Sequence, residues 1–272
     1  MNNNWLKLGC FLAVGVAVAI LLEGCSTVPV TGRRQLKLVS SDQEIQLGLT
    51  SFEQLKSTTP ISRDPAANAM VQRVGKRIAM VASNDLPDAQ WEFVVFESPE
   101  ANAFCLPGGK VGVYTGLLPI ARDDAGLATV LGHEIGHAVA HHGAERMSEA
   151  LVLQGAGKLV GSAVATKSPE YVDAVLLAWG AGTKVGRELP HDRKQESEAD
   201  EIGIVYMAKA GYDPKAAIDF WERFAAYNKQ KGGQSNFLSQ FLSTHPVDEV
   251  RIQHLKELLP KAEAEFAKSK MR

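Results

Sequence analysis

Apolar side chains recur every three or four positions along much of this chain, which is the spacing that places them on one face of an α-helix. This pattern predicts helices over residues 41–56, 65–83, 123–146, 196–210, 214–228 and 247–268. Shorter runs predict strands over residues 91–96, 102–106 and 111–114, the last two joined by a Pro-Gly-Gly turn. We therefore expect an α+β fold, mainly helical, with a small β-sheet or hairpin beside the long helix at 123–146.

A different pattern covers residues 151–182, which are apolar and rich in Gly and Ala. Four charged residues divide this stretch: Lys158, Lys167, Glu170 and Asp173. No piece between them reaches the roughly 18 apolar residues that a membrane-spanning helix needs. Buried or cleft-lining helices are therefore expected here rather than a membrane span.

The start of the chain has the pattern of a targeting segment. Lys7 is followed by an apolar run over residues 8–22, which is typical of a secretory signal. The run ends in Leu22-Glu23-Gly24-Cys25, which resembles the bacterial lipobox, where the chain is cut before the cysteine and the cysteine is lipidated. The resemblance implies a signal peptide over residues 1–24, a lipid on Cys25, a tether over residues 25–40 and a single domain over residues 41–272. An uncleaved signal anchor is the alternative.

Ser26 follows the lipidated position. In enteric bacteria, a residue other than Asp there usually lets a lipoprotein move to the outer membrane. The lipobox resemblance therefore predicts a lipid-anchored protein of the bacterial cell envelope, at the periplasmic face of the outer membrane. Several acyl chains would make such an anchor stable.

The charges of the chain are nearly balanced, with 29 Lys and Arg against 31 Asp and Glu among 272 residues. This balance argues against a nucleic-acid partner that binds through a broad basic surface. The chain has three cysteines. With Cys10 in the signal and Cys25 lipidated, only Cys105 remains, and no internal disulfide can form. Its apolar neighbours Phe104 and Leu106 predict a buried small residue rather than a reactive thiol.

The predicted helix at 123–146 carries the motif His133-Glu134-Ile135-Gly136-His137. Two histidines four positions apart lie about 40° apart around a helix axis, so both imidazoles can bind one metal, with Glu134 beside it to act on a metal-bound water. Glycine costs about 1 kcal/mol relative to alanine inside a helix, so Gly136 indicates close packing or a site requirement. The motif favours a catalytic zinc site over a helix with incidental histidines.

A catalytic zinc needs a third protein ligand. A third histidine ten positions after His133 is excluded, because residue 143 is Gly. An acidic ligand from a second helix is the alternative, and Glu196-Ser197-Glu198-Ala199-Asp200 supplies it. Glu196 and Asp200 share one helix face, so we expect Glu196 to ligate while Asp200 accepts a ring N–H from a ligating histidine. Glu198 points about 200° away from Glu196 and is the weaker ligand candidate.

Two further histidines follow in the same predicted helix. His141 lies about 80° around the axis from His133, so we expect it to border the site. His142 is expected to face nearly away from the site, as a packed or capping residue.

Taken together, these motifs resemble a known metallopeptidase family, which contains the HtpX heat-shock protease, the CAAX prenyl endopeptidase and periplasmic BepA. The resemblance is carried by the two motifs above, by Ser243-Thr244-His245-Pro246 and by Arg251, five residues after that proline. Residues 102–109, Asn-Ala-Phe-Cys-Leu-Pro-Gly-Gly, are similar to the family's segment beside the catalytic cleft. The resemblance covers residues 28–258. Within the family, the lipobox and the Val-Thr-Gly-Arg-Arg tether are most similar to LoiP-type outer-membrane lipoprotein proteases.

The family resemblance implies a zincin-like fold of the gluzincin type with one zinc per chain, held by His133, His137 and Glu196. It further implies that His245 and Arg251 lie near the metal, and that the cleft segment pairs with the substrate backbone through three residues: Asn102, Ala103 and Phe104. His245 would stabilise the oxyanion or cap the zinc in a latent state, and the sequence does not choose between these roles.

We therefore predict a membrane-anchored zinc endopeptidase that hydrolyses peptide bonds of misfolded or cell-envelope proteins, with Glu134 taking the proton of the attacking water. An anchored chaperone-like or assembly protein, which uses the cleft for binding, is the alternative. The physiological substrate, the cleavage sequence and the oligomeric state are not encoded in these motifs.

Overall fold

The computed structural model describes residues 25–168, 171–183, 189–230, 245 and 249–271. The predicted signal peptide over residues 1–24 lies outside the described residues, as do the neighbours of His245 in its motif.

Two helices lie at the centre of the fold: α5 (Asp124–Val139) and α8 (Leu189–Lys209). They pack closely because glycines stand where they meet. A Cβ added at Gly136 would lie only 2.8 Å from the carbonyl oxygen of Ala199, and one added at Gly203 would lie 2.7 Å from the amide nitrogen of His133. Gly136 therefore marks the close packing that its presence inside a helix predicts.

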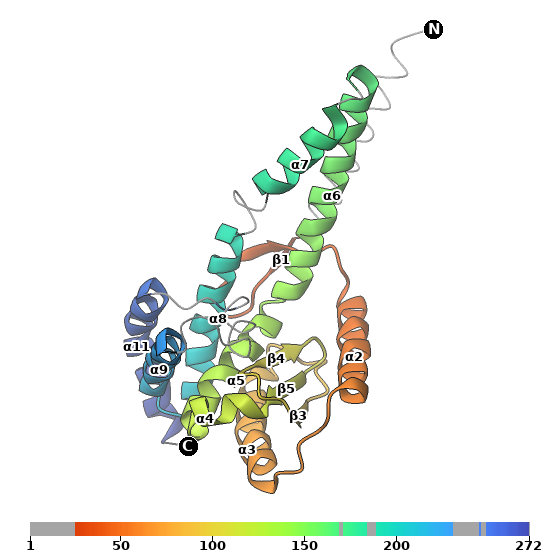
Figure 1. The fold of residues 1–272 in the computed structure, drawn as a ribbon. Coiled ribbons are helices and arrows are strands. Elements are labelled where there is room, and N and C mark those ends of the chain that lie inside the picture. Colours follow the sequence, from red (N-terminus) through yellow and green to blue (C-terminus); the bar gives the residue numbers. More distant parts are fainter. Residues whose placement is uncertain (1–24, 169–170, 184–188, 231–244, 246–248, 272) are drawn as a thin grey trace.

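Three more helices pack around this pair (Figure 1): α3 (Pro65–Ala82), α9 (Lys215–Gln230) and α11 (Glu249–Ser269). The beginning of α3 is as predicted, because the Asp64 side chain accepts a hydrogen bond from the Ala66 N–H and Pro65 occupies the first turn. Apolar faces of these helices form the main core, in which the aromatic rings of α9 are fully buried: Phe220, Trp221 and Phe224.

A three-stranded sheet lies against α5. Its strands are β3 (Glu92–Phe96), β4 (Ala103–Leu106) and β5 (Lys110–Tyr114), in the order β3-β5-β4. β4 and β5 form the predicted antiparallel hairpin, with Phe104 opposite Gly112, while β3 runs parallel to β5. The turn needs its glycines, since Gly108 and Gly109 have φ of 82° and 78°. A 3-10 turn, η1 (Thr115–Leu117), and α4 (Leu118–Ala121) lead from the sheet to α5.

The segment expected to be a tether packs against the body of the protein. Its strands β1 (Cys25–Thr27) and β2 (Arg34–Leu36) form an antiparallel hairpin, and Val28 between them is fully buried. Helix α2 (Ser41–Thr58) follows, with a capping box formed by Ser40 and Gln43. Residues 25–36 of the predicted tether are therefore a structured hairpin.

The long helix predicted over residues 123–146 is broken. α5 ends at Val139, and α6 (His142–Lys167) begins after His141, whose φ of 53° lies in the left-handed region. The break has tertiary causes, because the His141 ring contacts the buried carboxylate of Glu44 at 2.9 Å. Periodicity alone could not show it, since the contact joins residues 97 positions apart.

α6 and α7 (Val172–Thr183) form an arm that projects from the body (Figure 1). Two leucines of the arm are largely exposed, Leu159 at 74% and Leu177 at 77%. The prediction of buried or cleft-lining helices over residues 151–182 is therefore wrong for this arm. The stretch is apolar, and among the described residues its main packing is of α6 against α7. Among the helices that the structure describes, none has the length and apolarity to span a membrane.

Candidate metal centre

The two histidines of the α5 motif lie one turn apart on the face that meets α8. The Nε2 atoms of His133 and His137 are 3.1 Å apart, and both side chains are buried. The two rings converge because they are four positions apart on one helix, and Gly136 lets α8 approach that face closely.

Glu196 reaches the same point from α8. Its carboxylate oxygens lie 3.2 Å from His133 Nε2 and 3.1 Å from His137 Nε2. Glu196 is buried, and burial alone would raise the pKa of its carboxyl. The three histidine rings around it outweigh burial and hold that pKa well below its usual range. The carboxylate is thus an anionic donor aimed at the two imidazoles.

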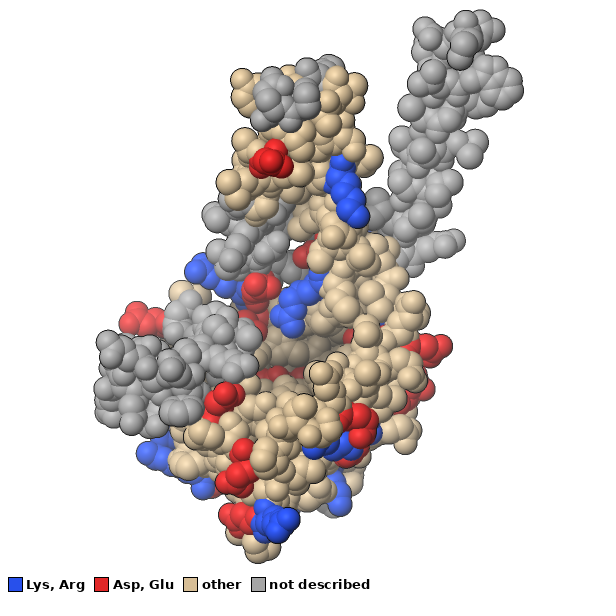
Figure 2. Space-filling view, turned by 45° about the vertical axis from the view of Figure 1, so that its right-hand side comes forward, with Lys and Arg blue, Asp and Glu red and all other residues tan. Residues whose placement is uncertain are grey.

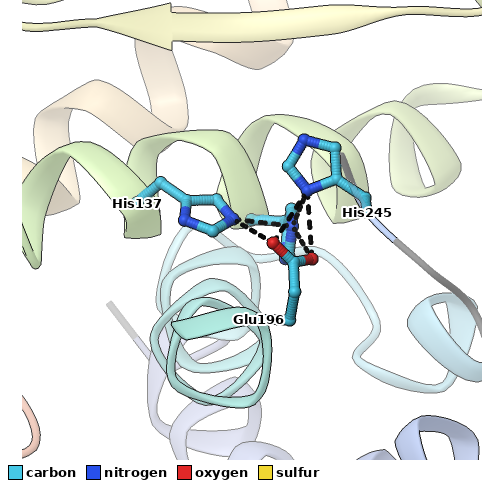
Figure 3. Close-up of side chains that lie close together, drawn as sticks. His137, Glu196 and His245 are labelled. Atoms are coloured by element: carbon cyan, nitrogen blue, oxygen red, sulfur yellow. Dashed lines mark hydrogen bonds and ion pairs between the residues drawn. The ribbon is translucent and has the colours of Figure 1, made fainter. Parts of the chain in front are cut away.

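His245 completes the cluster. Its Nδ1 lies 3.1 Å from His133 Nε2 and 3.0 Å from Glu196 Oε2. Figure 3 shows His137, Glu196 and His245 pointing toward one another from separate segments of the chain. The sequence resemblance brings His245 near the metal, and the structure places it among the donor atoms themselves.

The donor set fits a zinc ion. Around a tetrahedral zinc with bonds of about 2.0–2.1 Å, neighbouring donor atoms are separated by about 3.3 Å. The measured separations of 3.0–3.2 Å are close to that value. All four donor atoms lie within 4.8 Å of one another, from His133, His137, Glu196 and His245. Imidazole and carboxylate are ligands that zinc takes in proteins.

Asp200 lies behind His133, as predicted. Its Oδ1 is 2.9 Å from His133 Nδ1, while Arg251 donates to the same carboxylate through Nε at 2.6 Å and Nη2 at 2.8 Å. Burial would raise the pKa of Asp200, but Arg251 and His133 lower it to about 2. The Arg251 guanidinium is itself held over the Trp221 ring, 3.8 Å from its centroid. His133 is therefore fixed by a carboxylate that an arginine keeps ionised.

Glu134 stands beside the donors without joining them. Its Oε1 is buried, has no hydrogen-bond partner among the described residues, and lies 3.5 Å from His245 Nε2. Burial raises the pKa of the Glu134 carboxyl, while His245 and His133 act to lower it. An unpartnered buried carboxylate is costly, and a water molecule or a substrate group at this position would satisfy it.

A cleft of about 450 Å³ opens beside Glu134 and His137. The three residues predicted to meet the substrate line it: Asn102, Ala103 and Phe104. Half-buried Cys105 also lines the cleft, where burial raises the pKa of its thiol. Figure 2 shows the molecule hollowed at the base of the arm, with acidic side chains in the hollow.

One contact of the site was not predicted from the sequence. His142 does not face away but lies fully buried with its Nδ1 2.7 Å from His137 Nδ1. Its Nε2 contacts Glu198, which was the weaker ligand candidate and does not belong to the donor set. If residues 124–146 formed one straight helix, the His142 side chain would face away from His137. The left-handed turn at His141 brings it back toward His137. No sequence signal marks that turn.

Comparisons with known proteins agree with this geometry. The sequence pattern of peptidase family M48 matches residues 65–259. The mitochondrial metalloendopeptidase OMA1 of Schizosaccharomyces pombe is 35% identical over 244 residues, which is 87% of this chain and 67% of the relative. OMA1 of Saccharomyces cerevisiae is 32% identical over 274 residues, covering 93% of this chain and 76% of the relative. The β-barrel assembly-enhancing protease of Escherichia coli is 26% identical over 244 residues, covering 89% and 49%.

These relatives correct one prediction, the location at the periplasmic face of a bacterial outer membrane. The prediction depends on residues 22–25 and Ser26, whereas the S. pombe comparison extends over 244 aligned residues and leads to a protein that is mitochondrial by name. The comparisons support the family as a whole, and not specifically its HtpX, CAAX prenyl endopeptidase or LoiP members.

Proposed function

This chain belongs to peptidase family M48, and from that membership we propose that it cleaves unfolded or membrane-associated proteins while anchored to a membrane. The chain is a zinc metalloendopeptidase, as its family and its OMA1 relatives show. The anchor, the substrate class and the roles of individual residues are the proposal. It is carried by one observation, the convergence of three histidines and Glu196 beside the buried Glu134, whose Oε1 has no hydrogen-bond partner among the described residues.

His133, His137 and Glu196 are the proposed zinc ligands, because their donor atoms form one buried triangle. Bound zinc supplies Lewis acidity, which polarises the scissile carbonyl and lowers the pKa of a water molecule. Glu134 takes the proton of the attacking water and passes it to the leaving amine. Its position favours this role, since Glu134 lies at the cleft and its Oε1 has no hydrogen-bond partner among the described residues.

The substrate is proposed to lie along β4. Within the described residues, β4 pairs only with β5, so its other edge has backbone groups available for an added strand. Asn102, Ala103 and Phe104 line the cleft on that side of Glu134. Backbone pairing of this kind is largely independent of side chains, which suits an enzyme that cleaves unfolded chains of varied sequence.

His245 is proposed to close the site. A catalytic zinc keeps one position open, whereas a fourth protein donor gives a closed centre. His245 Nδ1 lies 3.0–3.1 Å from the donor atoms of His133 and Glu196, which favours the capping role over the oxyanion role. The side chain would then have to leave before water and substrate can enter.

The proposed anchor is a lipid on Cys25. Cys25 is exposed at the start of β1, so the thiol is accessible at the edge of the packed hairpin. The expected lipid adds a mass that intact-protein mass spectrometry would detect. In a detergent-partitioning assay, the lipidated wild type should be recovered in the detergent phase. Recovery of Cys25→Ala in the detergent phase to the same extent as the wild type would contradict this anchor.

The test of the catalytic proposal compares wild type with Glu134→Gln on a denatured substrate protein, with products identified by mass spectrometry. We expect Glu134→Gln to keep one zinc per chain and to lose at least about 100-fold in cleavage, the usual contribution of a general base. Glu53→Gln is the matched control, because the Glu53 side chain is 66% exposed on α2. Cleavage by Glu134→Gln at the wild-type rate would contradict the role of Glu134.

The same experiment separates the chaperone-like alternative. The E. coli relative is named for assembly as well as proteolysis, so binding without cleavage is the specific competing outcome. If wild type and Glu134→Gln suppress aggregation of the substrate equally and neither yields fragments, the cleft serves binding and the proposal of a protease acting on unfolded chains fails.

A further inference from the structure

His142 is the starting point, because it is a fully buried histidine that belongs neither to the donor set nor to the cleft lining. It contacts His137 on one side, Nδ1 to Nδ1 at 2.7 Å. On the other side its Nε2 lies 3.0 Å from Glu198 Oε2. The imidazole therefore bridges a proposed metal ligand and a carboxylate that points away from the metal.

With zinc on His137 Nε2 and both rings neutral, one arrangement of protons satisfies this chain of contacts. His137 must keep Nε2 without a proton, because that atom faces Glu196 and the other donors. Its Nδ1 then carries the proton and donates to His142 Nδ1. His142 must accept there, so its own proton is on Nε2 and is donated to Glu198. One arrangement satisfies all three groups, and it requires Glu198 to be an ionised acceptor.

Glu198 is held ionised by the N-terminal hairpin. Arg33 Nε donates to Glu198 Oε2 at 2.6 Å, and Thr31 Oγ1 donates to the other carboxylate oxygen. The two Nη atoms of Arg33 form a bidentate pair with Glu145 at 2.7 and 2.8 Å. One guanidinium thus pairs with two buried carboxylates beside the metal centre.

The arrangement behind His137 repeats the one behind His133. His133 is backed by Asp200, and Asp200 by Arg251 from α11. His137 is backed by His142 and Glu198, and Glu198 by Arg33 from the loop between β1 and β2. Each imidazole therefore has an ionised carboxylate and an arginine behind it. Outer partners of this kind fix the tautomer and orientation of a ligand, and their loss typically weakens metal binding by about 10- to 100-fold.

We propose that His142, Glu198 and Arg33 are positioning residues for His137, so that docking of the N-terminal hairpin sets the zinc affinity of the enzyme. This inference rests on the ligand role of His137 in the proposed function. It makes residues 31–33, which lie next to the proposed membrane anchor, part of the metal centre. A force or a partner that lifts the hairpin would loosen the metal without touching a ligand.

The test measures zinc affinity of the full chain by competition with a chromophoric chelator, for Arg33→Gln and His142→Leu. Both should bind zinc about 10- to 100-fold more weakly than wild type. Arg73→Gln is the matched control, because Arg73 forms a comparable two-point pair with Asp124 at 2.6 and 2.7 Å, away from the donor atoms. Its zinc affinity should equal that of the wild type. His142→Gln keeps one acceptor and one donor, and should regain most of the affinity that His142→Leu loses.

Two further readouts separate positioning from stability. The visible absorption of the Co²⁺-substituted protein should change for Arg33→Gln, because the His137 ring is free to turn, and not for Arg73→Gln. The thermal midpoint of each metal-free variant reports folding alone. A lower midpoint for Arg33→Gln with wild-type zinc affinity would overturn the proposal and leave Arg33 a purely structural role. If His142→Leu does not fold, the zinc affinity of Arg33→Gln decides the test. We expect that variant to fold, because the Arg33 side chain is 30% exposed.

Failure of the proposed function would look different. A wild-type protein that binds no zinc, or that keeps its zinc after Glu196→Ala, would contradict the ligand set itself. Wild-type zinc binding that depends on Glu196 but not on Arg33 or His142 would contradict only the positioning role.

Discussion

Replacing Gly136 by alanine should weaken the metal centre although alanine is the better helix former. Gly136 lies in α5 between the two metal-site histidines, where the backbone of α8 passes close by. The new Cβ would stand 2.8 Å from the carbonyl oxygen of Ala199 and 3.3 Å from its Cα. Both contacts are with backbone, so no side chain can turn aside to make room.

The size of the displacement follows from these contacts. Ordinary contact begins at 3.4 Å, so α8 must retreat by 0.6 Å from the Ala199 oxygen contact at 2.8 Å. Glu196 lies one turn away on the same helix and moves with it. Metal–ligand distances tolerate about ±0.2 Å, so the retreat is about three times what the site accepts. Zinc affinity should fall at least tenfold, on the order of the loss seen when ligands are left poorly oriented.

Stability and zinc affinity should both be measured, with Gly155→Ala as the control. Gly155 lies in α6, and a Cβ there would meet nothing within 4 Å. Gly155→Ala should stabilise the protein by about 0.5–1 kcal/mol, since only helix propensity changes. In Gly136→Ala, the gain in helix propensity is outweighed by an overpacking cost of about 1–3 kcal/mol, so the free energy of unfolding should fall. For a chain of this size the thermal midpoint should shift by about 2–4 °C per kcal/mol, upward for Gly155→Ala and downward for Gly136→Ala. A Gly136→Ala protein with a raised midpoint and unchanged zinc affinity would refute the packing argument.

Three other predictions concern the site and the fold. Glu196→Ala should lose its bound metal, and one zinc per chain by elemental analysis would refute its ligand role. Zinc uptake at pH 7 should release a proton, because in the metal-free protein Glu196 and Asp200 raise the pKa of His133 to about 9, although burial and Arg251 act to lower it. Zinc binds the neutral ring, so its apparent affinity should rise about tenfold per pH unit until about pH 9. Because a proton is released to the buffer, the heat of zinc binding in titration calorimetry should depend on which buffer is used. Equal heats in two buffers with different ionisation enthalpies would exclude this. Tyr206→Phe should lower the free energy of unfolding, measured in urea, by about 1.5–3 kcal/mol, because the buried Tyr206 hydroxyl donates to the Asp85 carboxylate at 2.5 Å. An unchanged unfolding midpoint would contradict that contribution.

The parts of the fold that sequence reasoning predicted are those with local causes. Asp64 and Pro65 start α3 through a cap and a fixed φ, and Pro107-Gly108-Gly109 makes the β4–β5 turn through positive φ at the two glycines. The face shared by Glu196 and Asp200 also follows from helical spacing alone. Each of these features depends on residues within one or two turns of one another, and each is found where the pattern predicts it.

The parts that were missed depend on residues far apart in the chain. The break after Val139 is stabilised by contacts between His141 and Glu44, which are 97 positions apart, and between His142 and Glu198, which are 56 positions apart. The docked hairpin depends on Arg33 reaching Glu198 across 165 positions. Spacing rules treat each helix as an isolated cylinder, so they cannot show a turn that only distant partners stabilise.

The charges around the donors explain why so many distant contacts meet here. Three buried carboxylates belong to this centre, Glu134, Glu196 and Asp200, and among the described residues one guanidinium, Arg251, lies against them. With neutral imidazoles the group carries two uncompensated negative charges, which a divalent cation cancels. Without the metal, burial and Arg251 lower the pKa of His133, but the carboxylates of Glu196 and Asp200 raise it to about 9, so we expect the ring to hold a proton instead. Zinc and proton therefore compete for one buried negative site. Arginines from α11 and from the hairpin hold the carboxylates behind His133 and His137 ionised in either state, so that the two imidazoles keep their orientation when the metal arrives.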